Sequence, residues 1–167
     1  MSMKAPSKSR KSKSVKAVPE GFHNVTPFLM VDNANGLIEF MQKAFDGKVT
    51  SLMKMDNGNV MHATVRIGDS EIMVADVMDR ATQQPMPTML YLYVDDVDAM
   101  YEQALRASGI SLRVPTDEFY GDRSAGVKDD WNNQWWLATH KEDVSEEEME
   151  RRKEEFLSKS KEEHVTH

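Results

Sequence analysis

Residues 28–45 read FLMVDNANGLIEFMQKAF and residues 90–105 read LYLYVDDVDAMYEQAL, and these two stretches share one pattern. Each begins as an apolar strand, passes through Val-Asp and continues with apolar residues at helical spacing. A hairpin turn follows each stretch, at Gly68-Asp69 and at Asn132-Asn133, and both landmarks recur after 63 residues (94 − 31 and 132 − 69). Because one repeat cannot bury its apolar face alone, the pattern predicts two packed repeats in one domain, with a ligand cleft between them.

The pattern predicts an α+β domain over residues 20–141, built from two βαβββ repeats. In the first repeat, about residues 22–77, we expect a helix ending at Asp46-Gly47 and strands over 25–31, 48–55, 60–67 and 71–75. In the second repeat, about residues 88–141, we expect a helix over 97–105 and strands over 89–94, 110–114, 125–128 and 134–140. Residues 78–87 are predicted to be a linking loop, and residues 115–126 a longer loop.

The two ends of the chain differ from this domain in composition. Residues 1–19 hold six Lys and Arg and no acidic residue, which is typical of a disordered basic leader. Residues 20–140 hold 9 basic and 18 acidic residues, so only the leader could attract nucleic acid. Residues 142–167 predict a helix that begins with a capping box (Ser145 and Glu148) and ends in a frayed tail. This helix would pack lightly on the domain or on a second subunit.

Composition excludes several classes of protein. The chain of 167 residues has no cysteine, so disulfides, a thiolate nucleophile and cysteine metal ligands are impossible. No apolar run approaches the roughly 18 residues that a membrane span needs, and no signal-peptide segment precedes the domain. The sequence therefore predicts a cytoplasmic protein that does not enter the membrane.

Six short motifs, spread over residues 22–150, carry a resemblance to a known family. They are VTPFLMVD (25–32), MHA (61–63), IGDS (67–70), YVDDVDA (93–99), FYGDR (119–123) and NQWWLATH (133–140). With these motifs the chain resembles the vicinal oxygen chelate superfamily, which includes glyoxalases, bleomycin-resistance proteins and dioxygenases, and within it the PhnB-like group. The resemblance implies a curved, cup-shaped sheet of eight strands with helices outside, a homodimer, and a small molecule bound in the cup.

The resemblance also implies where a divalent metal would be held. The four ligand positions of the superfamily's metal enzymes fall on Val25, Met73, Met89 and Trp136. None of these side chains is a normal ligand for an ion that prefers imidazole or carboxylate. We therefore expect no cofactor and no metal at the usual positions. The turn over 129–133 lacks the proline and glycine that relatives have there.

His62 is the central histidine of the chain, on the strand face opposite the helix-packing residues Ala63 and Val65. With Thr64 it would point into the cup and could bind a ligand or act as a general base. The alternative is a histidine with a purely structural or surface position. A relocated metal at His62 would need further ligands, for which Asp76 and His140 are the candidates.

Aromatic side chains predict an apolar wall on the second repeat. Tyr91, Tyr93 and Trp136 share one strand face, where they would line a pocket or pack between the repeats. The loop around Tyr120 reaches the rim of the cup, and Arg123 could bind an anionic group or pair with the neighbouring Asp122. The candidate ligand-contacting residues are His62, Thr64, Tyr91, Tyr93, Tyr120, Arg123 and Trp136.

Three functions remain open on the sequence. The first is a metal-free protein that binds a small organic molecule in the cup. The second is an enzyme of lyase, isomerase or dioxygenase type that uses His62, with or without a relocated metal. The third is an interaction protein recruited through its basic leader.

Overall fold

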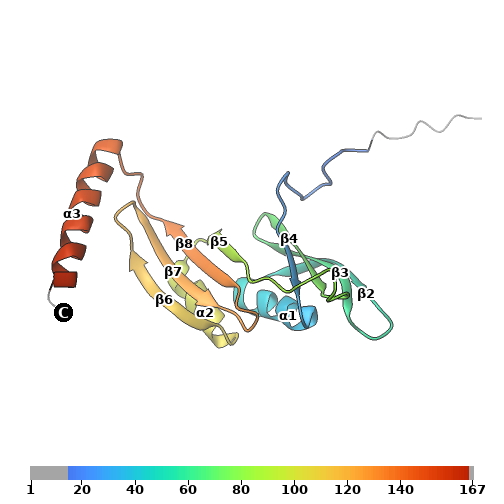
Figure 1. Cartoon of the computed structure of the whole chain (residues 1–167). Coiled ribbons are helices and arrows are strands. Elements are labelled where there is room, and N and C mark those ends of the chain that lie inside the picture. The colour runs from blue at the N-terminus through green and yellow to red at the C-terminus, as the bar shows by residue number, and fades with distance from the viewer. Residues whose placement is uncertain (1–14, 166–167) are drawn as a thin grey trace, which may run out of the picture.

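The computed structural model describes residues 15–165, and most of the predicted leader lies outside these residues. The elements follow the βαβββ order twice (Figure 1). The first repeat consists of β1 (Phe28–Val31), α1 (Ala34–Phe45), β2 (Lys48–Lys54), β3 (Val60–Ile67) and β4 (Ser70–Asp76). The second consists of β5 (Met89–Tyr93), α2 (Val97–Arg106), β6 (Ile110–Asp117), β7 (Asp122–Lys128) and β8 (Gln134–His140), and α3 (Glu146–Val165) follows it.

Each repeat forms its own four-stranded sheet. The orders are β1-β4-β3-β2 and β5-β8-β7-β6, with one parallel pair in each sheet, β1 with β4 and β5 with β8. The α+β class with two βαβββ repeats and a C-terminal helix is confirmed, and within the chain the eight strands are divided between two four-stranded sheets. The reason is that the helices α1 and α2 pack against each other at the junction and hold the helix-covered faces of the two sheets together (Figure 1).

The junction between the repeats is a shared apolar core. Trp135 of β8 is fully buried against the α1 rings, with its centroid 4.8 Å from Phe45 and 6.4 Å from Phe40. Burying an aliphatic or aromatic side chain of this size stabilises the fold by about 1.5–3 kcal/mol. The repeats therefore form one cooperative core, and within residues 15–165 no helix covers the opposite face of either sheet.

The turn between β7 and β8 is organised by a buried carboxylate. Asp129, 1% exposed, accepts hydrogen bonds from the backbone N–H of Trp131 and Asn133 and from the Trp135 indole. Asn132 takes a left-handed conformation with φ 64°, which asparagine tolerates better than most residues. The turn thus forms without the glycine that relatives have in it.

Two of the predicted strand boundaries are wrong at positions where a proline lies. β1 begins at Phe28 rather than at residue 25, because Pro27 has no N–H for the ladder. β6 continues through Pro115 to Asp117, where a loop was predicted. It is an edge strand with an irregular register, so the missing N–H is tolerated there.

Helix α3 stands away from the two sheets in Figure 1. Its side-chain contacts with the rest of the chain include Phe156 packed on Phe119 at a centroid distance of 5.3 Å, and Arg152 paired with Glu142 at 2.8 Å. The predicted frayed end lies partly in residues 166 and 167, outside the described residues. Among residues 15–165, no helix is both long and apolar enough to cross a membrane.

Candidate ligand site

The two sheets present equivalent open faces, defined here as the faces that α1 and α2 do not cover. On the first, Phe28 of β1 lies beside Met73 of β4, and on the second, Tyr91 of β5 lies beside Trp136 of β8. Both pairs are separated by 63 residues (91 − 28 and 136 − 73), so the repeat places large apolar or aromatic side chains at matching points. These faces are the surfaces on which an apolar ligand could lie.

Three of the predicted aromatic residues meet on the second open face. Tyr91 and Tyr93 have ring centroids 5.5 Å apart, and Trp136 is the cross-strand partner of Tyr91. Trp136 lies over Gly126 of β7, where a Cβ would stand 3.2 Å from the indole ring. The absent side chain at Gly126 therefore makes room for the indole and lets it lie close to the sheet.

Beside these rings, one buried carboxylate organises the end of the second sheet. Asp122, 5% exposed, accepts a hydrogen bond from the Tyr93 hydroxyl at 3.0 Å and lies 2.7 Å from Nδ1 of His140. The other ring nitrogen of His140, Nε2, lies 2.9 Å from the carboxylate of Asp143. Hydrogen bonds to Asp122 and then to Asp143 raise the pKa of His140 above its ordinary value, since they favour the imidazolium form.

Tyr120 joins this cluster from the loop between β6 and β7. Desolvation by burial, with a hydrogen bond to Tyr120, raises the pKa of Tyr91. A hydrogen bond to Asp122 likewise raises the pKa of Tyr93. Both phenols therefore stay neutral at physiological pH. The cluster thus consists of neutral tyrosine hydroxyls around His140 and around Asp122, whose carboxylate is already hydrogen-bonded.

His62 and Thr64 lie on the first open face, as predicted. His62 packs against Phe28 at a centroid distance of 5.9 Å and makes no side-chain hydrogen bond within the described residues. Thr64 is buried beside Met73. Farther along the face, Arg66 pairs with the buried Glu71 at 2.6 Å. Within the described residues, the ring nitrogens of His62 are thus free to hydrogen-bond a ligand on this face.

Arg123 is separated from the other candidate residues. It points to the helix-covered side of β7, where its guanidinium binds Asp98 of α2 at 2.7 Å and Asp117 at 3.1 Å. The alternative pairing with Asp122 is not formed, because neighbouring residues of a strand point to opposite faces. Arg123 therefore fastens α2 to the sheet and lies away from both open faces.

A model of the Glyoxalase/Bleomycin resistance protein/Dioxygenase superfamily matches residues 21–137, more than half of the chain. The chain belongs to this superfamily. An uncharacterized protein of Mycobacterium bovis is 29% identical over 135 residues, which cover 75% of this superfamily member and 89% of that relative.

Solved structures of the superfamily type share the fold. TioX from Micromonospora sp. ML1 is similar with a TM-score of 0.58 and 16% identity, covering 70% of this chain and 99% of TioX. A PhnB protein from Bacillus cereus, titled a putative 3-demethylubiquinone-9 3-methyltransferase, is similar with a TM-score of 0.53 and 22% identity, covering 70% and 99%. The PhnB-like resemblance is thereby confirmed at the level of fold.

The donor set at the superfamily's metal positions does not fit a divalent ion in this member. Met73, Met89 and Trp136 all lie on the open faces, and Val25 precedes β1 with its side chain 85% exposed. A valine, an indole and two thioethers cannot replace imidazole and carboxylate. Within the described residues, no three His, Asp or Glu side chains are grouped to hold a metal.

Asp76 does not supply a ligand to His62 either. Its two carboxylate oxygens accept the backbone N–H of Ala34 and of Val60, at 2.8 and 2.6 Å, from a position 5% exposed. Asp76 is therefore a structural group at the start of α1. His140, the other candidate partner of a relocated metal, is in the second sheet and is held by Asp122.

The Asp122–His140 pair was not predicted, although the sequence contains a signal for it. The hairpin is centred on Trp131, so antiparallel pairing joins Asp122 to His140, as the register shows. The prediction missed the pair because β7 was expected to begin at residue 125. It in fact begins at Asp122, directly after Gly121, which has φ 97°.

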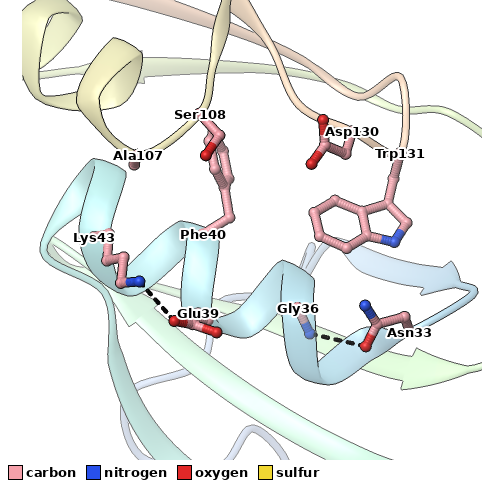
Figure 2. A pocket seen from close by; sticks show the side chains of 9 residues that line it. All are labelled: Asn33, Gly36, Glu39, Phe40, Lys43, Ala107, Ser108, Asp130 and Trp131. Carbon is pink, nitrogen blue, oxygen red and sulfur yellow. Dashed lines mark hydrogen bonds and ion pairs between the residues drawn. The ribbon is translucent and has the colours of Figure 1, made fainter.

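A polar groove of about 470 Å³ lies elsewhere, between α1, the end of α2 and the β7–β8 turn (Figure 2). Its walls include Phe40, the Glu39–Lys43 ion pair and Trp131, whose indole lies over α1 next to Gly36. None of the candidate ligand residues lines this groove. It belongs to the junction of the repeats rather than to the open faces.

Proposed function

We propose that this protein binds a small, largely apolar organic molecule on its open sheet faces, without a metal at the positions that the superfamily uses. The observation that carries the proposal is the pairing of large apolar side chains at equivalent points of the two faces, Phe28 with Met73 and Tyr91 with Trp136. Apolar and aromatic walls with few polar groups are typical of small-molecule sites.

The exposure of these faces supports a site that one chain does not complete. Met89, Tyr93 and Met53 are 64%, 68% and 57% exposed, and Phe28 is half exposed. A soluble monomer rarely leaves so many large apolar side chains in contact with water on its faces. A bound ligand and a covering surface together would remove them from water.

A second copy of the chain is the covering surface that fits best. The two open faces carry the same kind of side chains at matching points, and in one chain they belong to separate sheets. A twofold arrangement can place the first open face of one copy against the second open face of its partner. The symmetry then creates two equivalent contacts of this kind. The homodimer would then enclose two identical ligand sites, each lined by His62 and Thr64 of one copy and by Tyr91, Tyr93, Tyr120 and Trp136 of the other.

Ligand binding can be tested with a neutral apolar dye, Nile red, because a charged dye would also report electrostatics. Purified protein should raise the dye's fluorescence, and the dye should quench tryptophan emission. The Trp136→Phe variant should lose most of this quenching, because Trp136 lies on the open face. The matched control Trp131→Phe should keep it, since Trp131 lies at the junction. Absence of dye binding, or equal quenching in both variants, would refute the proposal.

A further inference from the structure

The polar groups of the second open face offer a ligand an N–H donor at His140. The buried carboxylate of Asp122 is already engaged by Tyr93 and His140. The exposed edge of the His140 ring faces a possible ligand, and the hydroxyl groups of Tyr91 and Tyr120 lie nearby, hydrogen-bonded to each other. A surface of this kind favours a ligand that brings an acceptor oxygen.

Asp122 determines how His140 can act. Its Oδ1 lies 2.7 Å from Nδ1, which fixes the ring orientation, and Nε2 is directed toward Asp143. Asp122 is buried while His140 is about half exposed, so the carboxylate is held by the fold and the outer ring edge is accessible. His140 is thus a positioned N–H donor at the border of the aromatic cluster.

The group that now accepts from Nε2 is only loosely fixed. Asp143 lies three residues after His140, its side chain is fully exposed, and its carboxylate is 2.9 Å from Nε2. An ion pair this exposed is weak, because water and salt screen the attraction between its charges. Another carboxylate can therefore replace it at small cost, whereas Asp122 cannot be displaced.

We propose that His140 binds the carboxylate of a planar aromatic acid whose ring lies against Tyr91, Tyr93 and Trp136, and that Asp143 occupies this position when no ligand is bound. The inference rests on the proposed function and names the ligand class for the same site. The Asp143 carboxylate shows the geometry that the ligand's acid group would adopt. The aromatic rings supply the apolar contact, and the hydrogen-bonded pair of Tyr91 and Tyr120 leaves one O–H to donate.

Two simple probes of equal ring size separate the acid from the ring. Benzoate carries the carboxylate, and benzyl alcohol is a neutral analogue with the same ring. Binding of both to the full-length protein is measured at neutral pH by NMR titration, with the aromatic protons of the probe as the reporter. Benzoate should bind about five- to tenfold more tightly than benzyl alcohol, as expected for one charge-assisted hydrogen bond.

The variants then locate the carboxylate. Asp143→Asn should tighten benzoate binding by about two- to fivefold and leave benzyl alcohol unchanged, because it removes only the internal competitor. His140→Gln should abolish the preference for benzoate. Since His140→Gln could disturb Asp122, the exposed Asp143→Asn variant keeps the test independent of folding, and Asp69→Asn is the control for a change of net charge at an exposed acid.

The outcomes distinguish the two proposals. If benzoate and benzyl alcohol bind equally, or if Asp143→Asn leaves benzoate binding unchanged, the inference about His140 is overturned while the apolar site stands. If the protein binds Nile red but neither probe, the inference alone is likewise overturned. If neither the probes nor Nile red binds, the proposed function and the inference are both wrong.

Discussion

Asp76 and Thr139 lie 63 residues apart, and each hydrogen-bonds the start of the helix in its own repeat. Asp76 Oδ1 accepts the N–H of Ala34, the first residue of α1, at 2.8 Å, and Thr139 Oγ1 accepts the N–H of Val97, the first residue of α2, at 2.9 Å. Each repeat therefore satisfies its first helical donor from the last strand of its sheet. The duplication extends to single hydrogen bonds, although the two side chains differ in charge.

The difference between the two helix starts predicts unequal sensitivity to mutation. Asp76→Ala leaves two buried N–H groups unpaired, those of Ala34 and Val60, and should lower the free energy of unfolding by about 2–4 kcal/mol. Thr139→Val loses one such acceptor and should lower it by about 1–2 kcal/mol. Urea unfolding measures both. Equal effects, or a smaller effect at Asp76, would contradict this explanation of the helix starts.

Gly36 should be intolerant of alanine for a reason that lies in the other repeat. A Cβ at Gly36 would stand 2.9 Å from the Trp131 ring and 2.6 Å from the Asn33 amide. Gly36→Ala should therefore destabilise the protein by about 1–3 kcal/mol through overpacking, although alanine usually favours a helix by about 1 kcal/mol.

The Trp131→Ala background provides the control for Gly36. With the indole removed, Gly36→Ala should lose part of its penalty, while the contact with the Asn33 amide at 2.6 Å remains. The difference between the two backgrounds is the coupling energy of a double-mutant cycle. Thermal or urea unfolding of the four proteins gives this value. A penalty that is the same with and without Trp131 would mean that local backbone effects dominate.

Association into dimers should depend on the open faces. Met89→Glu on the second face and Met53→Glu on the first should each weaken the dimer at least about tenfold, because each would bury an unpaired carboxylate. Met86→Glu is the matched control, since Met86 is even more exposed (74%) but lies in the loop between the repeats. Sedimentation velocity over a range of concentrations measures the change. Dimers that survive both face variants would place the interface elsewhere.

The charge on His140 should respond to its two carboxylate partners. Asp122→Asn should bring the pKa of His140 down toward the ordinary value of about 6.5, and Asp143→Asn should lower it less, because Asp122 is the larger cause of the upward shift. NMR titration of the imidazole protons measures these changes. An unchanged pKa in Asp122→Asn would contradict the hydrogen-bond explanation.

The same shift fixes the sign of a pH effect on stability. Because the pKa of His140 is raised in the folded protein, its stabilising contribution is complete below about pH 6.5 and disappears as the pH rises through the folded value. The stability difference between the native protein and His140→Gln should therefore be largest in mildly acidic solution. At alkaline pH the free energies of unfolding of the two proteins should become closer to each other.

The sequence predicted the repeats because two local signals agreed in each of them. The Val-Asp step from strand to helix and the apolar helix stripe both recur after 63 residues, and Leu37, Phe40 and Phe45 are buried as their spacing required. Helical and strand periodicity report which face is buried, so the helices and most strands could be placed. The edge strand β6 could not, since Pro115 is also a typical loop residue.

The site was predicted in part because side-chain alternation is local while pairing is not. His62, Thr64, Tyr91, Tyr93 and Trp136 face away from the helices, as alternation along their strands indicates. The role of Asp122 depends on where β7 begins to pair with β8. The role of Arg123 depends on the position of Asp98 on α2. The arrangement of the sheets depends on how α1 meets α2, and no single stretch of sequence contains that information.

The loop over residues 77–88 links the two sheets, while Phe45 of one repeat and Trp135 of the other meet in the shared core. The halves are thus held together by side-chain packing as well as by the peptide that links them. A polypeptide cut within that loop would still present two complementary surfaces to each other. The fold should therefore survive a break in the backbone within this loop, and a circularly permuted chain could begin and end there.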